Sequence, residues 1–295
     1  MCGIVGLHLR DPELHPRLGA LLQGMLLQVA ERGPDSAGVA VYGDRRRCPA
    51  GYAAVSVLGA GPSPEKLLSG SVHPQAVVTV AGDTTVVAAP LPANDLVDAL
   101  RAADPGLRIV GFGTDVTVYK GVGTPGALAD VYDLAHASGW QGLAHTRMAT
   151  ESAVTPEGCH PFSVGPDQCL VHNGSFANHA TIRRELRAAG VAFDSENDSE
   201  VGARFVAAQL AAGADLEKAL RLLCERFDGF YTLLVTSADG FAVVRDAIAC
   251  KPAIIAETQR WVAMASEFRA LATLPGIESA RIYEPEPERV YAWQR

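Results

Sequence analysis

The second residue of this chain could combine two functions in amide chemistry. Cys2 directly follows the initiator methionine in the opening MCGIVG. If that methionine is removed, Cys2 carries a thiol nucleophile and a free α-amine that can act as its base. An α-amine has a pKa near 7.7–8.0, so a useful fraction is neutral at pH 7. The alternative is that Cys2 is only a small buried residue at the start of a strand.

Four polar motifs follow along the chain, and each also has a simple structural explanation. RGPDSAG begins at Arg32 and reads as a glycine-rich turn, and AHTRMATES places Arg147 just past an apolar strand. VHNG offers the side-chain amide of Asn173 and the N–H of Gly174, or else a hairpin turn. ENDSEV places Asp198 at a helix entrance, where it could be a cap.

Two further patterns resemble nucleotide and metal sites but lack essential parts. GVGTPG at residues 121–126 matches G-x-G-x-x-G, yet the next strand ends in His145 and Arg147 instead of an acidic residue for ribose. A tight turn before a helix is therefore favoured. The histidines form no HExxH motif, and His172 and His179 are expected in an Asn/Gly-rich turn, which favours a structural or loop role. We expect no metal site.

Composition excludes several classes of protein. The 295 residues suffice for one large or two ordinary domains, and 48% hydrophobic with 20% charged residues is typical of globular proteins. The net charge is 25 − 33 = −8 with no basic stripe, which argues against nucleic-acid binding. No apolar run approaches the roughly 20 residues that span a bilayer. Six cysteines without a CxxC pair indicate reduced thiols, so we expect a cytoplasmic protein without a signal peptide or membrane partner.

The elements that must position the motifs are short strands with helices grouped around them, which predicts an α+β fold. The stretch from about Arg45 to Thr117 is the least legible. The apolar patterns predict strands at CGIVGLHL, VAVYG, RIVGFG, VTVYKG, WQGLAHTR, QCLVHNG, GFYTLLVTS, GFAVVRD, PAIIAE and WVAMAS. They predict helices at RLGALLQGMLLQVAER, PLPANDLVDALRAAD, ALADVYDLAHAS, HATIRRELRAAG, SENDSEVGARFVAAQLAAG and LEKALRLLCERF.

Taken together, the ordered motifs resemble the class II glutamine amidotransferases, which are N-terminal-nucleophile hydrolases. The matching stretches are MCGIVG, RGPDSAG, HTRMAT, HNG and DSEV, and later RDAIACKP and MASEFRAL. The resemblance covers residues 1–43 and 119–271. It implies a four-layer αββα sandwich, formed by a single domain over residues 2–295 with an insertion at about 45–117.

The resemblance also implies roles in catalysis. Cys2 would form a γ-glutamyl thioester, with its own amine as the base. The amide of Asn173 and the N–H of Gly174 would form the oxyanion hole, where each donor is worth about 2.7–4 kcal/mol in the transition state. Arg32 would brace the strand that carries the nucleophile.

Further residues would bind the substrate by the same resemblance. Arg147 would hold the α-carboxylate of glutamine, because a planar guanidinium can make two parallel hydrogen bonds. Asp198 would hold the α-ammonium group, with Thr150 and Gly174 also contributing to the substrate site. The position after Thr150 is Glu151, where amino-sugar-forming relatives often have histidine, which suggests a different branch of the family.

The implied function is hydrolysis of L-glutamine, with ammonia passed to a synthase. No phosphoribosyl-binding motif, SGGxDS loop or sugar-isomerase region follows, so we expect the synthase on a separate polypeptide of a hetero-oligomer. The chain most resembles the free-standing amidotransferase subunit of N-methylglutamate synthase and glutamate-synthase-like complexes. No cofactor is expected on this chain. A flavin and an iron–sulfur cluster are expected on the partner subunits. The alternatives are a catalytically silent glutamine-binding scaffold and an N-terminal-nucleophile hydrolase of another amide.

Overall fold

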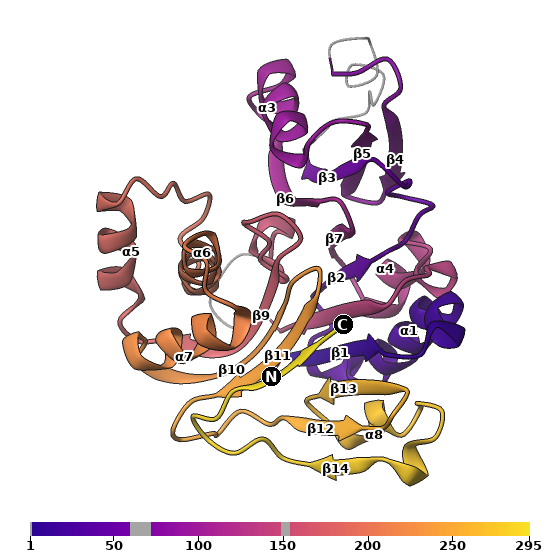
Figure 1. Ribbon diagram of the computed structural model, residues 1–295, viewed down its shortest axis with the longest axis vertical. Helices are drawn as coiled ribbons and strands as arrows, with labels where there is room; N and C mark the ends of the chain where they lie inside the picture. The colour runs from indigo at the N-terminus through magenta and orange to yellow at the C-terminus, as the bar shows by residue number, and fades with distance from the viewer. Residues whose placement is uncertain (1, 60–71, 149–153) are drawn as a thin grey trace.

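Two antiparallel sheets lie face to face at the centre of the protein (Figure 1). The structure is a computed structural model that describes residues 2–59, 72–148 and 154–295. The first sheet has seven strands in the order β14 (Arg281–Tyr283), β12 (Ile254–Glu257), β13 (Trp261–Ala265), β1 (Gly3–Leu9), β8 (Gln141–Arg147), β2 (Ser36–Tyr42) and β7 (Val116–Val122). The second has the order β15 (Tyr291–Gln294), β11 (Gly240–Arg245), β10 (Gly229–Thr236) and β9 (Cys169–Phe176).

Strand β1 is apolar apart from His8, and both of its faces are buried. Side chains alternate between the two faces of a strand. Ile4 joins the core between the sheets, together with Leu234 and Phe241 of the second sheet. Val5 and Leu7 belong to the core on the opposite face, beneath the outer helices. The strand that follows Cys2 is therefore held by the central packing of the molecule.

Helices cover the outer face of each sheet and complete four layers (Figure 1). The apolar stripes of these helices provide the outer cores. The seven-stranded sheet is covered by α1 (Leu18–Gln28), α4 (Pro125–Val131) and α8 (Phe268–Leu271). The four-stranded sheet is covered by α5 (His179–Ala188), α6 (Asp198–Ala211) and α7 (Leu216–Arg226). The predicted α+β class and the αββα layering are confirmed.

A third sheet is formed by residues in the least legible part of the sequence. Its strands have the order β4 (Val77–Ala81), β5 (Thr84–Ala89), β3 (Ala53–Leu58) and β6 (Arg108–Gly113), with α3 (Ala93–Ala103) packed against it. The buried carboxylate of Asp167 accepts hydrogen bonds from the backbone N–H groups of Thr114, Asp115 and Val116, each at 2.9 Å. These bonds fix the passage from β6 into β7, and so the third sheet is tied to the main body.

Two local predictions from the sequence were wrong. VHNG does not end a strand or form a hairpin turn, because β9 continues through Asn173 and Gly174 to Phe176. Gly174 has a φ of 139°, and a Cβ there would lie 1.9 Å from the carbonyl oxygen of Phe230, so glycine is required. The helix predicted at ALADVYDLAHAS ends at Val131, since Asp133 adopts a left-handed φ of 54°.

Candidate active site

A cleft of about 470 Å³ lies at the start of β1, near the end of β8 and at the beginning of α6. It brings together six of the site residues expected from the sequence. These are Cys2, Arg32, Arg147, Asn173, Gly174 and Asp198. Thr150 and Glu151 lie outside the described residues. The cleft also contains eight residues that sequence reasoning did not select: His145, Met148, His160, His172, Asn197, Ser199, Lys251 and Pro252.

Cys2 is held through its backbone at the edge of this cleft. Its carbonyl oxygen accepts hydrogen bonds from Nδ2 of Asn173 at 3.0 Å and Nε of Arg32 at 3.1 Å. The N–H of the next residue, Gly3, donates to Oγ1 of Thr146 at 3.0 Å. A Cβ on Gly3 would lie 2.8 Å from the side chain of Val29, so α1 and β1 approach closely here. The position of Cys2 is thus set by contacts on both sides of its backbone.

Arg32 links Cys2 to the beginning of α8. While its Nε contacts Cys2, its Nη1 donates to Oε1 of Glu267 at 2.6 Å. The hydrogen bond from Arg32, together with the charge of Arg269, lowers the pKa of the Glu267 carboxyl. Glu267 therefore stays ionised at neutral pH and orients Arg32. This geometry is what the bracing role expected for Arg32 requires.

The amide of Asn173 has its orientation set by a buried histidine. Because Nδ2 of Asn173 donates to Cys2, its Oδ1 faces Nε2 of His145 at 3.0 Å. Burial lowers the pKa of His145 to about 4, so the ring is neutral at pH 7. We assign the single ring proton to Nε2, since Oδ1 can only accept. His145 thereby keeps the donor end of the amide directed toward Cys2.

Two further neutral histidines lie beside His145. Nε2 of His160 and Nδ1 of His172 contact Oγ of Ser199 at 3.0 and 2.9 Å. Burial lowers the pKa of His172 to about 4 and that of His160 well below its usual range. Ser199 has one proton to donate, so at least one ring must donate to it. His172 is a buried residue of β9, and the turn location expected from the sequence was wrong.

The cleft carries opposite charges on separate elements. Arg147 is the last residue of β8, and Asp198 is the first residue of α6, capped by Asn197 through a 2.9 Å bond to the N–H of Ser199. Oδ2 of Asp198 accepts from the N–H of Phe176 at 2.9 Å, which fixes the carboxylate. Both charges face one space, so the cleft suits a zwitterion. No group of three or more potential metal ligands occurs among the residues that the structure describes.

Some of the missed residues had a signal in the sequence, because His172, Asn197 and Ser199 lie inside the VHNG and ENDSEV motifs. His145 stands two positions before Arg147 in a strand, so alternation places both side chains on the same face. His160 and Lys251 lie between strands and carry no such periodic signal. Lys251 lines the cleft with its amine 5.0 Å from the ring centre of Phe230, and only the fold brings it there.

Comparison with known proteins agrees with this geometry. The glutamine amidotransferase domain family matches residues 129–285. The chain is 49% identical over 298 residues to the glutamine amidotransferase-like protein GlxB of Rhizobium meliloti (strain 1021), covering 99% of this chain and 98% of that one. It is 30% identical to a putative glutamine amidotransferase of Methanothermobacter thermautotrophicus (strain ATCC 29096), covering 99% of each.

The fold is also found in a solved enzyme. The glutamine phosphoribosylpyrophosphate amidotransferase of B. subtilis, determined with ADP and GMP, superposes with a TM-score of 0.62 at 16% identity. The match covers 99% of this chain and 49% of that chain, so it shows the shared fold alone. With the motifs, the cleft and the two full-length relatives, the chain belongs to the class II glutamine amidotransferases of the N-terminal-nucleophile hydrolase fold.

Proposed function

We propose that the chain hydrolyses L-glutamine to glutamate and ammonia through a γ-glutamyl thioester on Cys2. The observation that carries the proposal is the position of Cys2, beside the Asn173 amide in a cleft that also contains Arg147 and Asp198. The proposal requires removal of Met1, because a peptide bond at the amine of Cys2 would abolish its basicity. No other group in this geometry is needed as the first base.

The reaction proceeds in two steps that use the same groups. The α-amine takes the thiol proton, and the sulfur attacks the side-chain amide carbon of glutamine. The amide of Asn173 and the N–H of Gly174 stabilise the oxyanion. Ammonia leaves with the proton from the amine, and the amine then activates the water that hydrolyses the thioester. His145 acts as a positioning residue, since it holds the Asn173 amide in the donor orientation.

Substrate recognition follows from the two opposed charges. Arg147 pairs with the α-carboxylate and Asp198 with the α-ammonium of the free amino acid. Hydrogen bonds to charged groups contribute about 1.5–3 kcal/mol each, so a peptide-linked glutamine that lacks both charges binds poorly. Thr150, which follows the HTR motif, completes the substrate site in this proposal.

The ammonia passes to a synthase site on another polypeptide in a cytoplasmic hetero-oligomer. We assign that partner to the glutamate-synthase-like or N-methylglutamate synthase class, with flavin and iron–sulfur chemistry on the partner subunits. The support is the motif resemblance of the stretch from AHTRMATES through ENDSEV. The chain itself supplies glutamine binding and thioester chemistry.

The decisive experiment combines N-terminal mass spectrometry with thioester trapping. The methionine-free protein, purified with its native partners, should release ammonia from glutamine and form a covalent adduct with labelled glutamine that the Cys2→Ala variant lacks. Glutamine binding without ammonia release would identify a silent scaffold. Equal turnover of γ-amides that lack the α-carboxylate would identify an amidase of other specificity. Either result would overturn the proposal.

A further inference from the structure

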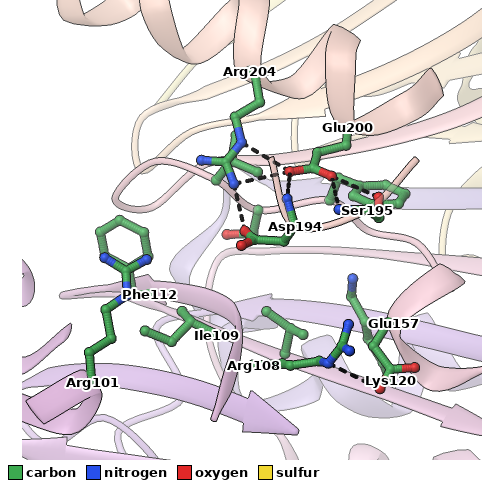
Figure 2. Close-up of a pocket in the computed structure, with 14 residues that line it drawn as sticks. Arg101, Arg108, Ile109, Phe112, Lys120, Glu157, Asp194, Ser195, Glu200 and Arg204 are labelled. Atoms are coloured by element: carbon green, nitrogen blue, oxygen red, sulfur yellow. Dashed lines mark hydrogen bonds and ion pairs between the residues drawn. The ribbon is translucent and has the colours of Figure 1, made fainter. Parts of the chain in front are cut away.

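A second cavity lies between the third sheet and the beginning of α6, apart from the glutamine cleft (Figure 2). Its volume is about 70 Å³. In Figure 2, Arg101, Ile109 and Phe112 of the third-sheet region form one side, while Asp194, Ser195, Glu200 and Arg204 lie on another. Lys120 of β7, Arg108 of β6 and Glu157 complete the labelled lining.

Lys120 is an unusual residue for such a position. It is 2% exposed, and its amine lies 4.7 Å from the ring centre of Phe162. Among the described residues, neither a hydrogen bond nor an ion pair reaches this amine. Burial lowers the pKa of Lys120 to about 8, which leaves it mostly protonated at pH 7. A buried ammonium without a counter-ion is costly, so the position calls for an anion.

The carboxylates around the cavity are already engaged. Glu200 accepts the backbone N–H groups of Asp194 at 2.8 Å and Ser195 at 2.7 Å, and it pairs with Arg204 at 3.0 Å. Asp194 pairs with Arg204 at 2.6 Å. Both carboxylates therefore have cationic or backbone donors of their own. The charge of Glu200 partly offsets the effect of burial on the pKa of Lys120, but Glu200 forms no ion pair with that amine.

The remaining acid, Glu157, lies near Arg108 at 3.8 Å. Among the residues that the structure describes, the lining thus has four cationic side chains, Arg101, Arg108, Lys120 and Arg204, against three carboxylates, Glu157, Asp194 and Glu200. One positive charge is left over inside a cavity that also has aromatic walls.

We propose that this cavity binds a small organic carboxylate of two or three carbons, paired with Lys120 and Arg108. The volume is that of only a few water molecules, which favours a small carboxylate with little attached carbon. Phe112 and Phe162 line the cavity and provide an apolar surface for that carbon. The third sheet supplies one wall, so the inserted residues create the site.

The two sites share the first turn of α6. Asp198 faces the glutamine cleft, while Glu200, two residues later, faces the cavity and fixes the backbone of residues 194–195. A ligand on the cavity side is therefore expected to change the KM for glutamine. The change in KM rests on the proposed function, whereas binding of a carboxylate in the cavity does not.

Acetate is the first probe, with acetamide as its neutral isostere. The full chain is titrated at pH 7 and constant ionic strength by calorimetry, and the Tm is followed in parallel. Acetate should bind saturably and raise the Tm, and acetamide should do neither. Lys120→Met should weaken acetate binding at least tenfold, and Arg108→Gln should weaken it less. Arg289→Gln, an exposed arginine elsewhere, should leave it unchanged.

Arg147→Gln separates the cavity from the glutamine cleft, because acetate could also pair with Arg147. Acetate binding that persists in Arg147→Gln and is lost in Lys120→Met supports the cavity site. Unchanged binding in Lys120→Met, loss in Arg147→Gln, or no saturable binding to the wild type overturns it. Circular dichroism checks that Lys120→Met is folded. If it is not, weaker acetate binding by Arg108→Gln is the test of the cavity site. Acetate binding by a chain without glutaminase activity would contradict the proposed function alone.

Discussion

The glutamine cleft and the cavity under the third sheet lie on opposite sides of the first turn of α6, and they treat buried ionisable groups differently. In the cleft, His145, His160 and His172 are neutral, and each has a hydrogen-bond partner in Asn173 or Ser199. In the cavity, the buried amine of Lys120 has no such partner among the described residues. Neutral hydrogen-bonded groups can hold donors in place for a negative charge that develops only in the transition state. A buried cation is instead stabilised by a ligand that carries a negative charge throughout.

The difference between the two regions also follows from how they are built. The cleft includes Cys2, directly before β1, and residues of β8, and both strands are inner strands of the seven-stranded sheet. It also includes residues of β9, whose Val171 joins the core between the sheets, so much of its backbone is held by the main core. The cavity has one wall from the third sheet and another from the entry to α6. A firmly held backbone suits a catalytic site, because the reacting groups must keep their positions. A cavity with walls from two separate elements suits reversible binding of a ligand.

The largest effect is expected at Cys2. Cys2→Ala should lower ammonia release by at least about 10³-fold, because no other group can form the thioester. Cys250→Ala changes an exposed cysteine and should keep full activity. Coupled assays for ammonia and glutamate measure both variants. Residual turnover of Cys2→Ala near the wild-type rate would remove the basis of the thioester mechanism.

Asn173→Ala should lower kcat by about 10²–10³-fold through loss of one oxyanion donor. His145→Ala should have a smaller effect, about tenfold, because it only releases the orientation of the amide. His145→Gln should recover part of this loss, since its amide N–H can donate to Asn173. Steady-state kinetics with glutamine test the series, and His136→Ala, at an exposed position, is the control. Equal losses for Ala and Gln at position 145 would argue against the positioning role.

Arg147→Lys should raise the KM for glutamine at least about tenfold while kcat changes less, because lysine cannot make the paired hydrogen bonds of a guanidinium. If Arg147→Lys binds acetate as tightly as the wild type does, the cleft and the cavity are separate binding sites. A fall in kcat without a change in KM would assign Arg147 to the reaction step instead.

Acidification should destabilise the protein through the cleft histidines. The native pKa values of His145 and His172 are about 4, below the usual histidine value of 6.5, so between these values the unfolded state binds more protons. Stability should therefore fall as the pH drops from about 6.5 to 4, by about 1.4 kcal/mol per pH unit for each group. Urea unfolding across this range measures the slope. His145→Gln should reduce it, and His136→Gln should leave it unchanged.

The smallest effect is expected at the cavity. There a substitution should stabilise the protein, whereas the substitutions in the cleft should impair activity. Lys120→Met should raise the free energy of unfolding at pH 7 by about 1 kcal/mol, because it removes a desolvated cation. The native pKa of Lys120, about 8, lies below the usual lysine value of 10.5, so the stability of the wild type increases as the pH rises through this window. The difference in free energy of unfolding between Lys120→Met and the wild type should therefore shrink between pH 8 and 10.5. A destabilised variant at pH 7 would mean that the amine already has a favourable partner.

The sequence predicted the elements better than it predicted the ends of the strands. Asn-Gly commonly marks a hairpin, yet at Asn173 the strand continues because β10 pairs along the whole of β9. The roles of Arg32 and Asp198 were expected from motif order, but their partners Glu267 and Phe176 come from distant or separate elements. No local pattern carries those pairings.

What the sequence determined by itself was the set of reactive groups and the layers that carry them. Cys2 directly after Met1, the apolar strands and the ordered motifs are local properties, since residue type and period act over a few neighbours. Only the tertiary structure decided that His145 directs Asn173, and that Lys120 is buried beside the third sheet with no ion pair to another described residue. Those facts depend on contacts between segments far apart in the chain, and burial, which sets both ionisation states, exists only after the layers have packed.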